Sequence, residues 1–449
     1  MGEAEGQGVT VSGPWRVGGG SGRLIDADGR PVFLLADTAW RMFAALSPGD
    51  IEFYLETRAK QGFNGVLVVG YYEHDCRTTP MADGQWPMLD GDPARPNPVL
   101  LERVEAMVDR AASFGLTVGF LPTWGHLVTP LWAGGEPILD ASKAAALGGV
   151  WADRLGDRDN LFWVIGGDRP AADDATRAVW RAMAEAIRAN EAKRHLMTFH
   201  PLGSSSSSDS WGAEGEAWLD LHAQQSGHAH RDPAVWERIT ADGAATARPV
   251  LDLEMPYEDH PIGFTPENGR FTDHDVRSAA YRGAFAGGCG VGYGAAAVWQ
   301  FCGGGPDTTT PVVKGSWPSR NWRESLSLPG AGQMRHLREL MESLPAGAAA
   351  RYDPHAVPNA DPHPSVWPVG CRVAAGDGPT RALLVYFPFR QSWLEVDTSC
   401  LGGGEVVVTW IDPRDGVTDA TTHPENPGRV VFTPPPGGPD WVLRIDRLD

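Results

Sequence analysis

Short apolar runs alternate with longer segments of helical periodicity along the first 345 residues of the chain. This alternation is typical of parallel β/α units, in which a helix returns the chain to the start of the next strand. The runs that predict strands are Val32–Leu35, Gly65–Val69, Thr117–Leu121, Leu161–Ile165, Leu196–Phe199, Trp218–His222, Val250–Glu254 and Ala295–Phe301. Eight such strands predict an α/β fold with a closed (β/α)8 TIM barrel rather than an open doubly wound sheet.

The segments between these runs carry signals that start and stop helices. Ser47 followed by Pro48 is a cap with proline at the first helical position, and Gly115 ends the segment that begins at Pro98. The predicted helices are Pro48–Lys60, Pro98–Phe114, Ser142–Leu155, Asp174–Glu191, Pro233–Ala241, Asp273–Ala286 and Gln333–Leu344. Before the barrel, Asp28-Gly29 lies between two apolar segments and predicts the turn of a β-hairpin.

The pattern changes after residue 345, where helix formers become few and short alternating runs are separated by proline and glycine. Runs of this kind predict antiparallel strands, here Ala382–Phe387, Ser392–Val396, Val406–Ile411, Arg429–Phe432 and Trp441–Ile445. We therefore expect a barrel domain with an N-terminal hairpin over residues 1–345 and a small antiparallel β-sandwich over residues 346–449. The short linker suggests that the sandwich packs against the barrel.

Composition narrows the classes of partner. The 38 Lys and Arg residues against 57 Asp and Glu residues give a formal net charge of −19, which argues against nucleic acid and anionic membranes as partners. The five cysteines are scattered and lack CxxC spacing, so we expect reduced thiols. Neither a secretory signal nor a membrane-spanning apolar stretch of ~18 residues is evident. The sequence favours a cytoplasmic protein, although removal of a signal peptide would leave the same evidence. It does not indicate the oligomeric state.

Two carboxylates follow strands of the predicted barrel. Asp168 closes the segment that begins at Leu161, and Glu254 closes the segment that begins at Pro249. The carboxyl ends of barrel strands form the catalytic rim. Glycoside hydrolysis needs one carboxyl that protonates the leaving oxygen and a second that attacks the sugar or activates water. A carbohydrate is therefore the expected substrate.

Each acid also has a simpler interpretation. Asp168 precedes Arg169 and Pro170, so it could cap a helix or form an ion pair. Asp252 lies two residues before Glu254 and shares its face of the strand, so periodicity alone does not separate these two acids.

Further polar and aromatic side chains are expected at the same rim as substrate contacts. Indole rings can stack on the C–H faces of sugars, and imidazoles can bind hydroxyls or adjust the carboxylates, although core packing is the more frequent role for each residue. The candidates are Asp37, Trp40, Trp124, His126, His200, His222, Tyr257 and Trp299.

Metal and nucleophile motifs are weak in this chain. His228-Ala229-His230 has the spacing of a metal pair, but the sequence offers no obvious third ligand. A GxSxG elbow and a reactive-cysteine motif are also absent from the sequence. We therefore expect neither a cofactor nor a metal.

Several of these segments together resemble a known family. The segments Phe33–Trp40, Gln61–Asn64, Asn160–Trp163, Gly166–Asp168 and the one ending at Glu254 are similar to those of the apiosidase-like glycoside hydrolases, family 140, formerly domain of unknown function 4038. The tail, with Tyr386-Phe387-Pro388 and the segment Trp410–Gly416, resembles the collagen-binding β-sandwich appended to that family.

The resemblance implies a retaining-type arrangement, with Asp168 on the fourth strand as acid/base and Glu254 on the seventh as nucleophile. Asp168 would be protonated at rest beside apolar walls such as Trp163 or Trp124, and Glu254 would be ionised. The expected reaction is the release of a terminal sugar, β-D-apiofuranose, from a plant glycan or glycoside. Another furanosidase, such as an arabinofuranosidase, and a non-catalytic carbohydrate-binding protein on a degenerate barrel are the alternatives. Retention of both acids argues against the second.

Overall fold

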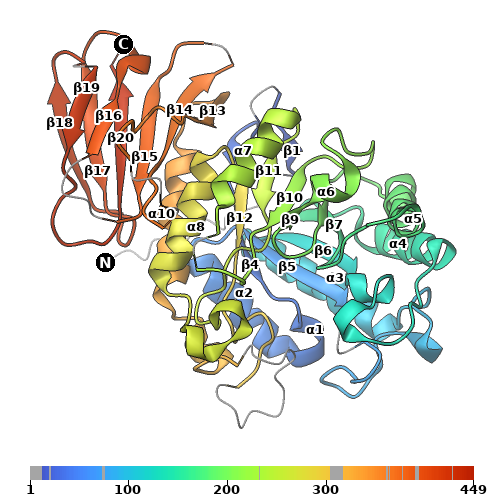
Figure 1. Ribbon diagram of the computed structural model, residues 1–449. Helices are drawn as coiled ribbons and strands as arrows, with labels where there is room; N and C mark the ends of the chain where they lie inside the picture. Colours follow the sequence, from blue (N-terminus) through green and yellow to red (C-terminus); the bar gives the residue numbers. More distant parts are fainter. Residues whose placement is uncertain are drawn as a thin grey trace, which may run out of the picture.

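Parallel strands and helices form a barrel, and a second, antiparallel unit lies beside it (Figure 1). The computed structural model describes residues 13–19, 22–72, 76–231, 233–303, 317–360, 363, 365–376, 378–389, 394–426 and 428–448. Within these residues the barrel strands are β4 (Leu34–Thr38), β5 (Gly65–Tyr71), β6 (Thr117–Thr123), β7 (Leu161–Gly166), β8 (Met197–His200), β10 (His222–Gln225), β11 (Val250–Asp252) and β12 (Gly290–Tyr293). All adjacent pairs along the order β8-β7-β6-β5-β4-β12-β11-β10 are parallel.

The barrel closes between β8 and β10. Thr198 Oγ1 donates a hydrogen bond of 2.9 Å to Leu221 O, and Asp220 N donates one of 2.9 Å to Met197 O. The short strand β9 (Ser205–Ser206) pairs antiparallel with the other edge of β10. The predicted TIM-barrel class is confirmed.

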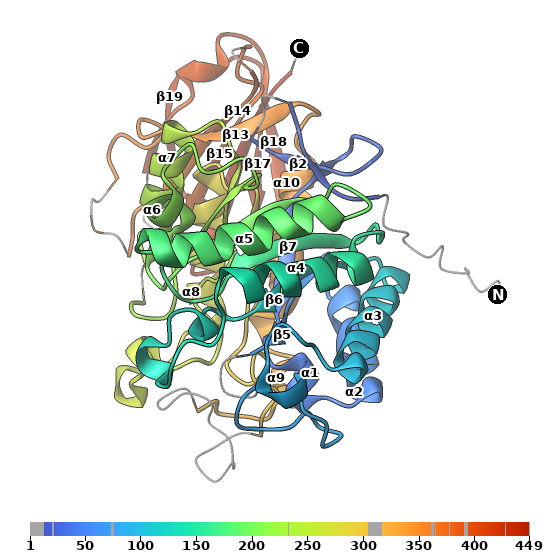
Figure 2. The same ribbon diagram turned by 90° about the vertical axis from the view of Figure 1, so that its right-hand side faces the viewer.

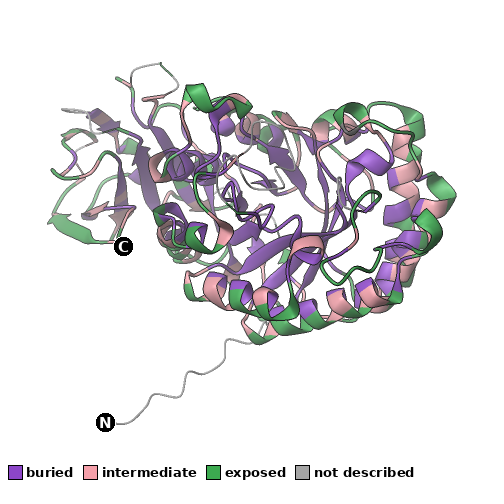
Figure 3. Ribbon diagram, turned by 90° about the horizontal axis from the view of Figure 1, so that it is seen from below, coloured by how far each residue is buried: buried purple, intermediate pink, exposed green. Residues whose placement is uncertain are grey.

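Alternation along each strand separates two layers of core. In β7, Phe162 and Val164 pack with the barrel interior, whereas Trp163 and Ile165 pack in the cluster between strands and helices. Figure 3 shows the barrel strands as buried, while exposed positions lie on the outward faces of the surrounding helices. This alternation decides which residues at the strand ends face the barrel axis.

The helices follow their sequence signals closely. Ser47 Oγ accepts a hydrogen bond from Asp50 N, and the Asn97 side chain accepts one from Val99 N. The long barrel helices are α2 (Pro48–Lys60), α3 (Pro98–Ser113), α4 (Ala141–Leu155), α5 (Asp174–Asn190), α7 (Val235–Ala245), α8 (Asp273–Phe285) and α10 (Pro329–Glu342). Figure 2 shows α4 and α5 side by side over β6 and β7.

Shorter elements connect the barrel units. They are the α-helices α1 (Met42–Ala45), α6 (Ser207–Trp211) and α9 (Trp322–Ser325), and the 3₁₀ turns η1 (Leu89–Gly91), η2 (Gly125–Leu127), η3 (Leu131–Ala133), η4 (Ile262–Phe264) and η5 (Pro266–Asn268). Before the barrel, β1 (Arg16–Val17), β2 (Leu24–Ile25) and β3 (Pro31–Val32) form an antiparallel sheet that contains the predicted hairpin.

Two of the predicted strands lie elsewhere. The run Trp218–His222 is largely a loop, and β10 begins only at His222. The run Ala295–Phe301 forms turns, whereas the last barrel strand is the glycine-containing segment Gly290–Tyr293. A Cβ on Gly292 would overlap Leu253 O of the neighbouring strand, so close approach of the backbones selects glycine at a position where the apolar pattern gives little signal.

The C-terminal unit is a β-sandwich, as predicted. One sheet has the order β13 (Ala348–Tyr352), β14 (Val369–Ala375), β15 (Ala382–Phe387), β20 (Trp441–Arg447), β17 (Val406–Ile411) and β18 (Thr418–His423). The other pairs β16 (Leu394–Asp397) with β19 (Arg429–Phe432), and η6 (Ser399–Leu401) lies between them in sequence. The sequence pattern did not reveal β13, β14 or β18.

Strand β15 is apolar on both faces because it packs on two sides. Leu383 and Val385 face the second sheet of the sandwich, whereas Leu384 and Tyr386 join the core cluster of the barrel helices. The ring of Tyr386 stacks on that of Tyr281 in α8, with centroids 5.1 Å apart. The sandwich therefore covers one flank of the barrel.

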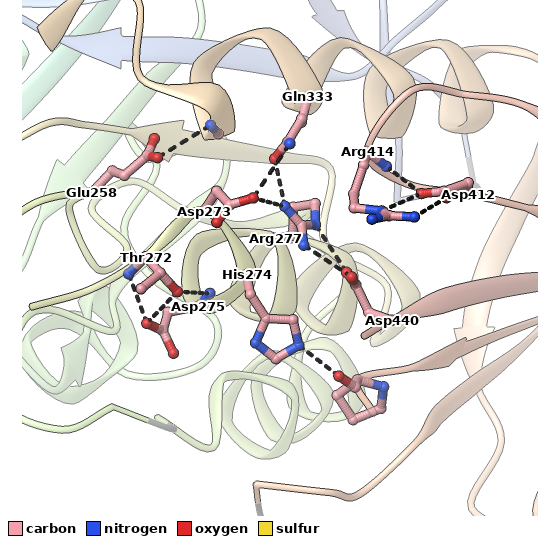
Figure 4. Close-up of polar contacts among 12 residues, drawn as sticks. Glu258, Thr272, Asp273, His274, Asp275, Arg277, Gln333, Asp412, Arg414 and Asp440 are labelled. Carbon is pink, nitrogen blue, oxygen red and sulfur yellow. Dashed lines mark hydrogen bonds and ion pairs between the residues drawn. The ribbon is translucent and has the colours of Figure 1, made fainter. Parts of the chain in front are cut away.

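A buried ion pair lies at this contact. Arg277 in α8 donates from Nε and Nη2 to the two carboxylate oxygens of Asp440, each at 2.9 Å, and Tyr386 Oη donates to the same carboxylate at 2.9 Å. Figure 4 shows Arg277 between Asp440, Asp273 and Gln333.

The cysteines and the helix lengths agree with the sequence analysis. Cys76, Cys289, Cys302, Cys371 and Cys400 all lie in the described part of the chain, and none of them is in a disulfide bond there. Within the described residues, no helix combines the length and the apolar character needed to span a membrane.

Candidate active site

A cavity of about 490 Å³ opens at the carboxyl ends of the barrel strands. Both predicted carboxylates, Asp168 and Glu254, line it. The other lining residues are Trp40, Tyr72, Trp124, Trp132, Leu202, Gly203, Ser204, Gln225, Gly227, His228, Ala229, Tyr257, His260, Phe264 and Trp299. The structure thus brings together Trp40, Trp124, Tyr257 and Trp299 from the sequence-predicted contacts.

Asp168 reaches the cavity through a sharp turn at the end of β7. Gly166 and Gly167 have φ values of 90° and 127°, and Asp168 itself has a φ of 52°. A Cβ on Gly166 would crowd His200 O, and one on Gly167 would crowd the indole of Trp124. The two glycines therefore allow the turn, and Asp168 is held in a left-handed conformation that non-glycine residues seldom adopt.

The surroundings of Asp168 include a cation. Arg169 Nη1 lies 3.3 Å from Asp168 Oδ2, and the buried guanidinium also donates to Asp168 O and to Thr129 O. The ion pair considered in the sequence analysis is therefore present, together with the position on the cavity wall. Trp124 lies against the turn, but Trp163 packs on the outer face of β7 and donates Nε1 to Glu191, so Trp163 does not form a wall for Asp168.

Glu254 lies between two imidazoles. His200 Nε2 is 3.0 Å from Glu254 Oε2, and His228 Nε2 is 3.0 Å from Oε1. Burial by itself would raise the pKa of Glu254, but the hydrogen bonds and charges of the two histidines outweigh it and hold the pKa below its ordinary value. The carboxyl group is therefore kept ionised.

His200 connects the two acids. Its Nε2 contacts Glu254, while its Nδ1 lies 3.2 Å from the donating N–H of Asp168 and 3.0 Å from Pro201 O. A neutral ring with the proton on Nε2 accepts from Asp168 N, whereas an imidazolium donates Nδ1–H to Pro201 O. One ring thus touches the segments that carry both carboxylates.

Aromatic side chains surround the floor of the cavity. The indole N–H of Trp40 donates to Tyr257 Oη at 2.8 Å, and the rings of Trp40 and Trp124 are 5.1 Å apart. The ring centroid of Tyr72 lies 5.3 Å from that of Trp124 and 6.2 Å from that of Trp299. Burial raises the pKa of Tyr257 well above its ordinary value, and the charge of Glu254 raises it further, so the phenol keeps its proton.

His260 supplies a further polar group. Burial lowers the pKa of His260 well below its ordinary value, and the neighbouring His228 lowers it further. The neutral ring donates Nδ1–H to Pro261 O at 2.8 Å, which leaves Nε2 as a hydrogen-bond acceptor. Nε2 of His260 can therefore accept a hydrogen bond from a hydroxyl group of a ligand.

Three predicted contacts lie away from the cavity, and the structure corrects them. Asp37 points outward from β4 and is buried against Arg58 Nε and Tyr54 Oη, each at 2.7 Å. His126 is buried beside Cys76, with Nε2 3.6 Å from Sγ.

His222 lies at the amino-terminal end of β10. It bonds Ser207 Oγ and Ala213 O there. Asp252 also turns away from the cavity, where Ser226 donates both N–H and Oγ–H to it, so the structure separates it from Glu254.

The sequence analysis missed several lining residues. His228 appeared only as half of a possible metal pair, and its Nε2 instead contacts Glu254. Among the described residues, no group of three or more His, Cys, Asp or Glu side chains is arranged to hold a metal ion. Tyr72, Trp132, Gln225, His260 and Phe264 lie in loops, in 3₁₀ turns or at a strand end, where periodicity carries no signal for them.

Comparisons with known proteins identify the family of the chain. The family described as "Apiosidase-like, catalytic domain" matches residues 20–347, and the one described as "Putative collagen-binding domain of a collagenase" matches residues 370–446. No curated protein sequence matches the chain.

Two solved structures resemble nearly the whole chain. A glycoside hydrolase family 5 protein from Bacteroides vulgatus ATCC 8482 has 27% identity and a TM-score of 0.84, and the match covers 97% of this chain and 94% of that one. A second structure, described as a glycoside hydrolase, has 27% identity and a TM-score of 0.83, with 97% of each chain covered. The first family match spans most of the chain, including both acids and the barrel that positions them, so the chain belongs to the apiosidase-like family and is a glycoside hydrolase.

Proposed function

We propose that the protein removes a terminal sugar, β-D-apiofuranose, from a plant glycan or glycoside with retention of configuration. The observation that carries the proposal is the position of Asp168 and Glu254 on one cavity, at the ends of β7 and β11. In a retaining glycosidase one carboxyl acts as acid and then base, and the other forms a covalent glycosyl-enzyme ester. The family match supports apiose as the sugar.

Glu254 is suited to the role of nucleophile. His200 and His228 keep it ionised, and each imidazole contacts a different carboxylate oxygen. The same contacts limit rotation of the carboxylate, so the attacking oxygen is positioned before the substrate binds.

Asp168 is assigned the acid and base steps. It donates a proton to the departing oxygen and later takes one from the attacking water. Its contact with Arg169 favours the carboxylate, which the second step needs, while the first step needs the carboxylic acid. Arg169 is also hydrogen-bonded to Thr129 O and Asp168 O, and these carbonyl groups share its charge.

The cavity suits a small sugar. A volume of about 490 Å³ lies in the lower part of the range for small-molecule sites, which favours one terminal sugar with part of its leaving group over a long polysaccharide segment. The aromatic floor offers faces for C–H contacts, and His228, His260 and Glu254 offer partners for hydroxyl groups.

A substrate screen tests the proposal. We expect the purified protein to hydrolyse an aryl β-apioside faster than an aryl α-L-arabinofuranoside at equal concentrations. A preference for the arabinofuranoside would assign the other furanosidase activity. Hydrolysis of neither glycoside, nor of any other aryl glycoside in the panel, would support a binding protein on a degenerate barrel.

The stereochemical course tests the assignment of Glu254. Proton NMR during the first turnovers should show a product with the anomeric configuration of the substrate, and added methanol should yield a methyl glycoside. Appearance of the opposite anomer first would make Glu254 a general base instead of a nucleophile.

A further inference from the structure

The hydrogen-bonding groups of the cavity lie on its floor, among buried aromatic rings, whereas the mouth is mostly apolar. His228, Glu254, Tyr257 and His260 are buried, so the groups that can bond hydroxyls lie deep. Besides Asp168, the partly or fully exposed lining residues are Trp132, Leu202, Gly203, Ser204, Ala229 and Phe264. Ser204 alone among these described residues of the mouth has a polar side chain.

Trp132 is the most exposed of the large apolar side chains at this mouth. It belongs to η3 and is 57% exposed, although it lines the cavity. The guanidinium carbon of Arg169 lies 3.7 Å from the centroid of the indole, which is the geometry of a cation–π contact. Arg169 itself is buried and held by Thr129 O, so one face of the indole rests on a fixed support.

The same guanidinium connects Trp132 to the acid. Arg169 Nη1 lies 3.3 Å from Asp168 Oδ2, so indole, guanidinium and carboxyl form a continuous row along one side of the cavity. In the proposed function, on which this inference rests, Asp168 protonates the leaving oxygen. The leaving group must therefore lie on the side of Asp168, next to Trp132.

We propose that Trp132 forms the leaving-group subsite and that this subsite takes a planar aromatic aglycone. An aromatic ring gains from contact with an exposed indole and needs few hydrogen bonds. Among the described residues of the mouth, Ser204 is the polar side chain that remains apart from Asp168, so the hydroxyls of a further sugar would lose hydration there with few protein groups to replace it. Phe264, 42% exposed, continues the apolar rim.

The test compares a phenyl glycoside and a methyl glycoside of the sugar that the screen identifies. We expect Trp132→Ala to lower kcat/KM for the phenyl glycoside at least tenfold more than for the methyl glycoside, and Trp132→Phe to restore most of the difference. Each substrate is compared with itself in wild type, so the intrinsic reactivity of the leaving groups cancels. Trp86→Ala, which removes an exposed tryptophan from a separate groove, is the matched control and should affect both substrates equally.

Equal losses on both glycosides in Trp132→Ala would overturn the subsite. A measurement on the wild type guards against misfolding of the variant: free phenol should inhibit hydrolysis of the methyl glycoside at a concentration at least tenfold lower than free xylose does. Equal or stronger inhibition by xylose would assign the subsite to a sugar. If wild type hydrolyses neither glycoside, the proposed function fails as well, whereas hydrolysis of both with equal losses in Trp132→Ala removes the subsite alone.

Discussion

The floor of the cavity and the contact between α8 and the sandwich both bury charged groups, but they satisfy them differently. At the contact, Arg277 and Asp440 match each other through two parallel hydrogen bonds, and both side chains are buried (Figure 4). Tyr386 donates a further hydrogen bond to Asp440, and Asp273 accepts a further one from Arg277. A pair of this kind has fixed partners and no access to a ligand.

At the floor, each oxygen of Glu254 has one imidazole partner, and the carboxylate still lines the cavity. An imidazole can both donate and accept hydrogen bonds, whereas a guanidinium only donates. The comparison teaches that buried charge alone does not identify a functional site. The cavity floor is distinguished by its imidazole partners and by its open side.

The largest effect should follow from removing the ionisable groups of the site. Glu254→Gln and Asp168→Asn preserve shape, and we expect each to lower kcat by ~10² to 10⁴ or more, because the nucleophile or the acid/base is lost. Circular dichroism and thermal unfolding should match wild type. Activity within about tenfold of wild type in either variant would refute the role of that residue.

Substitutions in the ion pair between α8 and the sandwich should change the stability of the protein and not its activity. Arg277→Met leaves Asp440 buried without its cation, and we expect the free energy of unfolding to fall by about 3 to 5 kcal/mol, with kcat unchanged below the melting temperature. Arg429→Met removes an exposed pair with Asp397 and should cost at most about 1 kcal/mol. Urea titration of both variants measures the difference. Similar decreases in the free energy of unfolding would show that the interface pair stabilises the protein no more than an exposed pair does.

The sequence predicted the parts of the fold that local chemistry determines. The bounds of α2 agree because Ser47 and Pro48 define its start, and β7 was found because an apolar run ends at Gly166. The last barrel strand was missed because close approach to β4 and β11 requires Gly290 and Gly292 there, a requirement that arises from tertiary packing.

The errors at the site have a geometric cause. The predicted sixth strand ends at His222 while the real one starts there, so the rim position belongs to Gln225. Asp37 ends its strand as expected, but Ala36 faces the barrel interior and Asp37 therefore faces α2. Conversely, both predicted acids line the cavity, and each follows an apolar run directly. His228 and His260 come from loops, whose paths a single sequence does not determine.

Glu258 is a third buried acid and differs from Glu254 and Asp440 in its partners. It forms no ion pair with any of the described residues. Tyr293 Oη donates to it at 2.6 Å. Gly330 N donates to it at 3.2 Å (Figure 4). Burial nevertheless raises the pKa of Glu258 to about 7. The folded state therefore keeps this proton between the ordinary pKa and pH 7 while the unfolded state loses it, so stability falls as pH rises through that window. The decline amounts to about 3 kcal/mol.

Glu258→Gln should remove that decline. We expect the variant to gain stability relative to wild type as pH increases from 5 to 8, by up to about 3 kcal/mol, since a neutral amide can still bond Tyr293 and Gly330. Urea unfolding at a series of pH values gives the difference. A gap that does not change with pH would mean that Glu258 is ionised throughout in the folded protein.

A smaller change should follow at one imidazole. His228→Leu removes the donor to Glu254 Oε1, and we expect kcat/KM to fall about tenfold, with its acidic limb moved to higher pH because the pKa of Glu254 rises. His228→Gln places an N–H near the same oxygen and should restore part of the loss. An unmoved acidic limb in both variants would show that His228 only fills space beside the nucleophile.

The smallest effect, no change at all, is expected on chelation. His200 and His228 both direct Nε2 toward Glu254, and His260 uses Nδ1 for Pro261 O, so each of these imidazoles has one ring nitrogen engaged with a protein atom. The reaction of a carboxylate pair needs no Lewis acid. Extensive treatment with EDTA followed by gel filtration should therefore leave kcat and KM unchanged. Activity that is lost and then restored specifically by Zn²⁺ or Ca²⁺ would show that these histidines bind a metal. The cavity floor would then be a metal site instead of a site for a hydrogen-bonded nucleophile.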